Sequence, residues 1–257
     1  MAPFALIIMD GLGLNPSSRG NAVLSANTPT LDSLLATQPN TTLTSFGPRV
    51  GLPEGQMGNS EVGHLNIGGG RIVQQELTKI NQAISNKTLA SIPSIVDCCA
   101  DINSREDAAV HFIGLVSTGG VHSDLGHLKA LISAVLERSV RQIYIHVITD
   151  GRDRPPTAAT EEVGELLQFI AECKQTFPAS KVEIASIIGR YFAMDRDKRW
   201  ERTESAYDLF TAGKGEPFDI PLAAIAAQHR SGTTDEFLPP LAFISTTSKP
   251  GSTAKNE

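Results

Sequence analysis

A serine in a glycine-rich stretch is the first candidate for chemistry in this sequence. Residues 55–70 have the sequence GQMGNSEVGHLNIGGG, which contains Ser60. The residues after Ser60 are compatible with a helix, and the N-terminus of a helix stabilises an anion through its backbone N–H groups and its dipole. A hydroxyl is a weak nucleophile unless a base or a metal activates it. Asp10, at the end of an apolar run at residues 4–9, is the nearest candidate for holding a metal against Ser60.

Two other interpretations of Ser60 stay open. A serine in a glycine-rich loop is often only a turn residue or a helix cap. A serine hydrolase would place it in a nucleophile elbow, but the local sequence GNSEV lacks the glycine two positions after the serine. A hydrolase also needs a Ser-His-Asp set, and the residues around Ser60 do not favour one.

A second group of candidates follows three predicted strands, at residues 110–117, 142–150 and 181–189. In an open parallel sheet, ligands bind at the carboxyl ends of the strands. Arginine presents a planar fork that matches phosphate and carboxylate, so several arginines at one edge predict a phosphorylated acid as ligand. The alternative is a set of solvated loop charges in local ion pairs. The candidates are His122, Asp124, Arg152, Asp153, Arg154, Arg190, Asp195 and Arg196.

The elements that position these residues alternate between strand and helix. This alternation predicts an α/β fold with a parallel sheet that is covered on both faces. The sequence predicts a loop at residues 190–200, between the third strand and the third helix. The other predicted elements are strands at 4–9 and 42–47, and helices at 28–39, 72–84, 128–138, 159–175 and 201–213.

Composition narrows the classes of partner and compartment. The 257 residues carry a net charge of -6, which argues against a nucleic-acid binder. The chain has three cysteines, two of them adjacent, which is a poor disulfide framework and indicates a reduced, cytoplasmic setting. The N-terminus lacks the features of a signal peptide, and no apolar run approaches the roughly 20 residues of a membrane span.

Five stretches of the chain, taken in order, match one known family. They are IIMDGLG, GQMGNSEVGHLNIGGGR, GLVSTGGVHSDLGH, TDGRDRPP and GRYFAMDRDKRWERT, and TDEFLPP at 234–240 is also similar. Together they resemble the cofactor-independent (2,3-bisphosphoglycerate-independent) phosphoglycerate mutases. The resemblance covers nearly the whole chain up to about residue 243.

The resemblance implies two domains and a reaction. Residues 1–74 would be an incomplete fragment of an alkaline-phosphatase-like domain. Residues 75–257 would be an inserted phosphotransferase-type domain with a parallel sheet, which binds phosphoglycerate and ends in a polar tail from about residue 245. The implied reaction is the glycolytic interconversion of 3-phosphoglycerate and 2-phosphoglycerate. The implied cofactors are two manganese ions, without 2,3-bisphosphoglycerate.

The resemblance also implies roles for individual residues. Ser60 would form a phosphoserine intermediate, and Asp10 and Ser60 would bind manganese. The implied substrate-binding residues are His122, Arg152, Asp153, Arg190 and Arg196. The histidines at 64, 111, 127, 146 and 229 match no metal ligand of the family.

The family's sequences continue beyond the TDEF stretch, with further substrate arginines and further Asp and His metal ligands. We therefore expect this chain to be an N-terminal portion that is weak or inactive alone, with the apolar residues of 4–9 left unburied. Two alternatives stay open. The chain could be a non-catalytic fragment that binds phosphoglycerate or a partner, or a second chain could supply the missing half.

Overall fold

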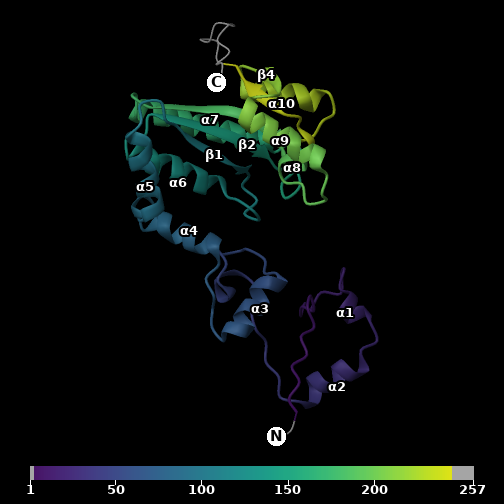
Figure 1. Ribbon diagram of the computed structural model, residues 1–257. Coiled ribbons are helices and arrows are strands. Elements are labelled where there is room, and N and C mark those ends of the chain that lie inside the picture. The colour runs from purple at the N-terminus through teal and green to yellow at the C-terminus, as the bar shows by residue number, and fades with distance from the viewer. Residues whose placement is uncertain (1–2, 245–257) are drawn as a thin grey trace. The chain divides into compact units, whose positions relative to one another are not determined.

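The computed structural model describes residues 3–244, and the chain divides into two compact units. Unit 1 comprises Met1–Lys79 and unit 2 comprises Ile80–Glu257 (Figure 1). The division lies a few residues after the boundary expected at residue 74. The polar tail expected from about residue 245 lies outside the described residues. Among the residues described, no helix is both long and apolar enough to span a bilayer.

Unit 2 is built on a mixed sheet. Within residues 80–244 the sheet has five strands in the order β1-β2-β3-β5-β4. The first three strands are parallel, as the alternation of strand and helix predicts. The strands are β1 (Val110–Val116), β2 (Gln142–Thr149), β3 (Lys181–Gly189), β4 (Glu216–Phe218) and β5 (Leu241–Phe243).

Helices cover both faces of this sheet (Figure 1). The crossover helices α6 (Leu125–Leu136) and α7 (Ala159–Thr176) pack on one face, where α10 (Pro221–Arg230) contacts α7. The short helix α8 (Arg190–Ala193) and helix α9 (Trp200–Ala212) pack on the other face. Right-handed β-α-β connections explain why both crossover helices lie on the same side.

Two details of unit 2 differ from the sequence prediction. The predicted loop at 190–200 begins with helix α8. Strand β5 is antiparallel to β3, so the sheet is not wholly parallel. The reason is topological: Leu238 accepts a hydrogen bond from the backbone of Gly189 at the carboxyl end of β3, so the strand that follows Leu238 runs back along β3.

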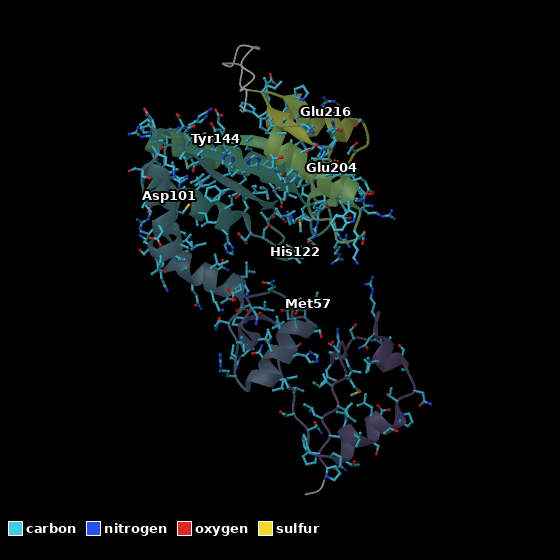
Figure 2. The ribbon with its side chains drawn as sticks, in the orientation of Figure 1. Met57, Asp101, His122, Tyr144, Glu204 and Glu216 are labelled. Carbon is cyan, nitrogen blue, oxygen red and sulfur yellow. The ribbon has the colours of Figure 1, made fainter. Side chains whose placement is uncertain are left out.

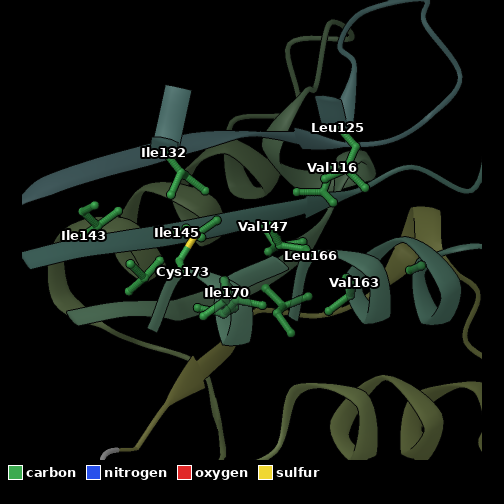
Figure 3. Packing of buried hydrophobic residues seen from close by; sticks show 14 of the residues in the cluster. Val116, Leu125, Ile132, Ile143, Ile145, Val147, Val163, Leu166, Ile170 and Cys173 are labelled. Carbon is green, nitrogen blue, oxygen red and sulfur yellow. The ribbon is translucent and has the colours of Figure 1, made fainter. Parts of the chain in front are cut away.

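The core of unit 2 consists of two clusters of buried side chains. The larger one lies between the sheet and the crossover helices (Figure 3). Each fully buried aliphatic side chain contributes about 1.5–3 kcal/mol relative to an exposed one. The larger cluster includes Ile143, Ile145 and Val147 of β2 with Val163, Leu166 and Ile170 of α7, and the smaller one contains Ile148, Ile188, Ala206 and Leu209.

Unit 1 is mainly helical and loop-like. Helix α4 crosses the division between the units. In residues 3–79 the hydrophobic cluster consists of Val50, Leu52 and Val62. The elements from the N-terminus to α5 are α1 (Ala22–Ser25), α2 (Pro29–Thr37), the 3-10 turn η1 (Gly47–Val50), α3 (Ser60–Gly69), α4 (Glu76–Ser85), the 3-10 turn η2 (Leu89–Ser91) and α5 (Pro93–Asn103), the last two of which belong to unit 2.

The two strands predicted in unit 1, at residues 4–9 and 42–47, are wrong, since neither segment is a strand among the described residues. A strand needs a neighbour that accepts and donates its backbone hydrogen bonds. No β-strand forms within residues 3–79, so neither segment has such a neighbour there. The apolar residues of 4–9 are exposed, as expected, with Phe4 at 91%.

Candidate functional site

A polar cleft of about 530 Å³ opens at the carboxyl ends of the parallel strands of unit 2. Figure 2 labels His122, which comes from the loop after β1. The loop after β2 and the segment after β3 supply the rest of the expected set. All five residues expected to bind substrate line this one cleft: His122, Arg152, Asp153, Arg190 and Arg196.

Arg190 lies at the floor of the cleft, directly after β3. Its side chain is only 9% exposed, and its Nη1 lies 2.7 Å from Asp150 Oδ1 and 2.6 Å from Asp153 Oδ2. Burial alone would lower the pKa of Arg190, but hydrogen bonds and charge attraction from Asp153 and Asp150 raise it. The guanidinium is therefore a fixed positive charge in the cleft.

Asp150 holds several groups of the cleft in place from beneath. Ser117 Oγ donates to its Oδ2 at 2.7 Å, and the backbone N–H groups of Arg152 and Asp153 donate to its Oδ1 at 3.2 and 3.0 Å. Burial would raise the pKa of Asp150, but hydrogen bonds from Ser117, the Asp153 backbone, Arg190 and the Arg152 backbone hold that pKa below its ordinary value. Asp150 is thus an anion buried in the structure.

A second carboxylate organises the segment that carries Arg196. Asp195 Oδ2 accepts hydrogen bonds from the backbone of Asp197 and Arg199, and its Oδ1 lies 3.0 Å from Arg202 Nη1. The Arg202 guanidinium also lies 3.8 Å from the centre of the Tyr191 ring. Within the described residues Arg196 itself is exposed and makes no ion pair, so its guanidinium is free to meet an anion.

Two glycines let a later segment reach the cleft. A Cβ on Gly151, which has φ of 68°, would lie 2.5 Å from the backbone N of Glu236. A Cβ on Gly189 would also collide with the Glu236 backbone. Because both side chains are absent, Glu236 and Phe237 line the cleft, and Glu236 Oε1 lies 3.7 Å from Arg152 Nη1.

Three candidates at the strand ends make structural contacts within unit 2. Asp124 caps helix α6, with its Oδ1 accepting from the Gly126 N–H, and it does not line the cleft. Arg154 Nε donates to the buried Glu162 carboxylate at 3.1 Å. Asp195 lines the cleft, but its contacts are internal. Local ion pairs therefore account for Arg154 and Asp195, and helix capping accounts for Asp124.

Several residues of the site are not among the predicted ones. Asp150 supports the cleft without lining it, and a carboxylate that directly follows a buried strand, as Asp150 follows β2, is a signal of a site. Glu236 and Phe237 lie in TDEFLPP, a stretch used only for the resemblance. The other lining residues that were missed are Tyr191, Met194, Asp197 and Arg202.

The histidines outside the cleft take part in contacts within their own units. In the core of unit 2, His146 Nδ1 lies 2.7 Å from Ser186 Oγ, and its Nε2 lies 2.9 Å from His111 Nδ1. Burial, together with the charge of His111, lowers the pKa of His146 to about 4. His127 Nε2 contacts Asn81 Oδ1, and His229 Nε2 contacts the buried Asp235.

In unit 1, Ser60 lines a separate hollow of about 630 Å³. Asn59 caps helix α3 by accepting from the Val62 N–H, which makes Ser60 the first residue of the helix. Asp10 lines the same hollow. Ser60 Oγ lies 3.3 Å from His64 Nδ1, but this nitrogen lies closer, at 2.8 Å, to the backbone oxygen of Ser60. His64 is therefore held as part of the helix rather than aimed at the hydroxyl as a base.

The residues around Ser60 supply too few metal ligands for a two-metal site. Asp10 and Ser60 offer two oxygen ligands, and no group of three or more His, Cys, Asp or Glu residues suited to a metal exists in residues 3–244. A two-metal site needs several ligands for each ion. The described residues therefore do not form such a site by themselves.

Comparison with known proteins identifies the family. The family model described as "BPG-independent PGAM N-terminus" matches residues 80–257. The chain belongs to this family. PGAM denotes phosphoglycerate mutase, so the matched family is the one indicated by the sequence motifs.

Individual relatives match nearly the whole chain. A 2,3-bisphosphoglycerate-independent phosphoglycerate mutase of Flavobacterium johnsoniae is 44% identical over 95% of this chain and 47% of its own length. One from Methanosarcina barkeri is 45% identical over 99% of this chain and 48% of its own length. A crystal structure of Leishmania mexicana phosphoglycerate mutase at low cobalt concentration aligns with a TM-score of 0.77 and 30% identity, covering 97% of this chain and 46% of that one. The chain thus spans about half the length of the relatives it matches.

Proposed function

We propose that this chain provides the phosphoglycerate-binding part of a 2,3-bisphosphoglycerate-independent phosphoglycerate mutase. Its ligands are 3-phosphoglycerate and 2-phosphoglycerate, which the enzyme interconverts in glycolysis in the cytoplasm. The family name and the relatives' names support the reaction class. The proposed binding site for these phosphoglycerates is the cleft of unit 2. The proposed binding residues are His122, Arg152, Asp153, Arg190 and Arg196.

The observation that carries the proposal is the convergence of these five residues in a single cleft. A phosphoglycerate has a phosphate and a carboxylate, and each suits the planar fork of an arginine. Arg152, Arg190 and Arg196 supply forks from the second and third strand ends. His122 and Asp153 lie 3.7 Å apart beside them and offer polar partners for the hydroxyl of the glycerate.

For the chemical step we propose Ser60 as the phosphoserine residue of unit 1. Its place at the first position of α3 supports this, because backbone N–H groups at a helix start stabilise phosphate charge. Manganese is the proposed metal, with Asp10 and Ser60 as two of its ligands. Since the described donor set is short, we propose that efficient turnover also needs ligands equivalent to those in the rest of the relatives' length, in this polypeptide or in a second chain.

Binding is best tested at Arg196, because the residue is exposed and makes no ion pair in the described structure. A hydrogen bond to a charged group contributes about 1.5–3 kcal/mol, so Arg196→Ala should weaken 3-phosphoglycerate binding by about tenfold or more. Arg199→Ala is the matched control, since Arg199 is an exposed neighbour outside the cleft. Calorimetric titration of the three proteins gives the comparison. Equal affinities for all three would contradict the assignment of the cleft.

A non-catalytic chain that only binds phosphoglycerate is the second candidate function, and the incomplete donor set around Ser60 favours it. The chain is incubated with manganese and 3-phosphoglycerate, with Ser60→Ala as control. Mass spectrometry for phosphate on Ser60 and an assay for 2-phosphoglycerate separate the two functions. Turnover at about 1–1000 per second, as in ordinary enzymes, would show that the chain is a mutase by itself. Binding without phosphorylation would support the non-catalytic function.

A further inference from the structure

We propose that Asp150 is a positioning residue, which fixes the guanidinium of Arg190 for the incoming anion before any ligand arrives. This inference rests on the proposed function, because it takes the Arg190 cleft as the phosphoglycerate site. Asp150 does not itself line the cleft. It would act through the groups it holds.

Because Asp150 and Arg190 are both buried, Arg190 needs Asp150 as its negatively charged partner. The side chains of Asp150 and Arg190 are 1% and 9% exposed, and Asp150 Oδ1 lies 2.7 Å from Arg190 Nη1. A buried charge without a partner is costly, so the Arg190 cation requires a fixed anion. Asp153 bonds the same nitrogen but is 21% exposed, lines the cleft and also faces His122. Asp150 is therefore the partner that stays in place when the cleft is filled.

Asp150 is itself held from other strand ends. Ser117, directly after β1, donates to one carboxylate oxygen. The backbone N–H groups of Arg152 and Asp153, after β2, donate to the other. One carboxylate thus links the ends of β1 and β2 to the arginine after β3.

The arrangement leaves part of Arg190 available to a ligand. In the described residues, the side-chain hydrogen bonds of Arg190 to Asp150 and Asp153 both run from Nη1. An anion in the cleft can therefore accept from Nη2 or Nε without displacing Asp150. A guanidinium that is already ordered loses less rotamer entropy on binding, and preorganisation of this kind raises affinity.

The first test uses the full wild-type chain without ligand. Side-chain guanidinium NMR signals of Arg190 and Arg196 are assigned from the signals lost in Arg190→Lys and Arg196→Lys. We expect Arg190 to show resolved, slowly exchanging protons and Arg196 to show averaged, fast-exchanging ones. If Arg190 is averaged like Arg196 in the ligand-free protein, the proposal is overturned. This readout stands even if an Asp150 variant fails to fold.

The second test replaces Asp150 with its near-isostere in Asp150→Asn. We expect the slow Arg190 signal to be lost and 3-phosphoglycerate binding to weaken by about ten- to a hundredfold, the effect of losing a charged hydrogen bond. Asp195→Asn is the matched buried control and should leave the Arg190 signal intact. Asp208→Asn, at an exposed ion pair with Lys214, is the control for a change of charge alone and should leave both signal and affinity unchanged. A retained slow signal or an unchanged affinity in Asp150→Asn overturns the proposal.

The two proposals fail in different ways. If the wild-type chain does not bind 3-phosphoglycerate, the proposed function fails. The guanidinium signals of the ligand-free protein still show whether Asp150 orders Arg190. If the wild-type chain binds but Arg190 is averaged, the function stands and the positioning role falls.

Discussion

In unit 1, the apolar residues Phe4, Leu6, Ile7, Ile8 and Met9 are 91%, 65%, 82%, 43% and 54% exposed. In unit 2, a similar run in β2 places Ile143, Ile145 and Val147 at 0–1% exposure. Both runs have the composition of a buried parallel strand. Only the second has neighbouring strands on both sides and covering helices within the described residues.

The comparison shows what neighbours contribute to a strand. Burying five large apolar side chains would contribute roughly 7–15 kcal/mol, which is as large as the stability of a typical domain. That is an upper figure, since an unfolded chain already hides some apolar surface. Unit 1 gains little of this from residues 4–9, and its cluster of buried apolar side chains is the small one of Val50, Leu52 and Val62.

The largest expected difference between the units is in hydrogen exchange. We expect backbone amides of β2 and β3 to exchange only on global unfolding, which for a typical domain protects them by several orders of magnitude. Amides of residues 4–14 should exchange within about a hundredfold of unprotected peptide. Mass-spectrometric exchange on the full chain measures both. Protection of residues 4–14 equal to that of β2 would remove the contrast.

A pair of glycines sharpens the comparison. Gly151 and Gly11 have similar φ values, 68° and 78°, but a Cβ on Gly151 would meet the Glu236 backbone, whereas a Cβ on Gly11 would meet nothing within 4 Å. We expect Gly151→Ala to destabilise unit 2 by about 2–5 kcal/mol, from backbone strain plus overpacking. Gly11→Ala should cost unit 1 the backbone strain alone, about 1–2 kcal/mol. Urea denaturation measures both changes in stability. Equal changes would show that backbone strain, without overpacking, accounts for the cost of adding a Cβ.

Acid should weaken unit 2 through His146. Its pKa is lowered from 6.5 to about 4 by burial and by His111, so the unfolded state takes up a proton first as the pH falls. The stability that neutral His146 contributes is full above pH 6.5 and is lost between about pH 6.5 and 4, by roughly 3 kcal/mol. Urea denaturation at several pH values should show a shallower slope for His146→Asn than for wild type.

The smallest expected effect concerns Glu236. Its contact with the half-exposed Arg152 spans 3.7 Å and contributes about 0–1 kcal/mol. Because the carboxylate competes with an incoming anion for Arg152, Glu236→Gln should tighten 3-phosphoglycerate binding by about two- to fivefold. Glu61→Gln, beside Ser60 in unit 1, serves as control and should leave affinity unchanged. Weaker binding in Glu236→Gln would mean that Glu236 supports the ligand instead.

The sequence by itself determined the parallel part of the sheet and its crossover helices. Periodicity and loop signals are local, so β1, β2, β3, α6, α7 and α9 lie close to their predicted positions. The carboxyl ends of parallel strands meet at one edge of the sheet, and this depends only on strand order and direction. The sequence therefore also predicted that the residues after the three strands lie close together. The family followed from motifs such as TDGRDRPP, and the match of the family model confirmed it.

The tertiary structure decided what depends on distant neighbours. The runs at 4–9 and 42–47 have strand-like composition, but no strand pairs with either of them within residues 3–244, so neither becomes a strand. Whether Arg190 is a free cation or a buried one depends on Asp150, which lies 40 residues earlier in the chain and meets it only when β2 and β3 pair. Glu236 likewise reaches the cleft only because Gly151 and Gly189 leave room for its backbone. The local sequence pattern predicted the five proposed binding residues of the cleft. Packing between distant segments determined their positions and their charged partners.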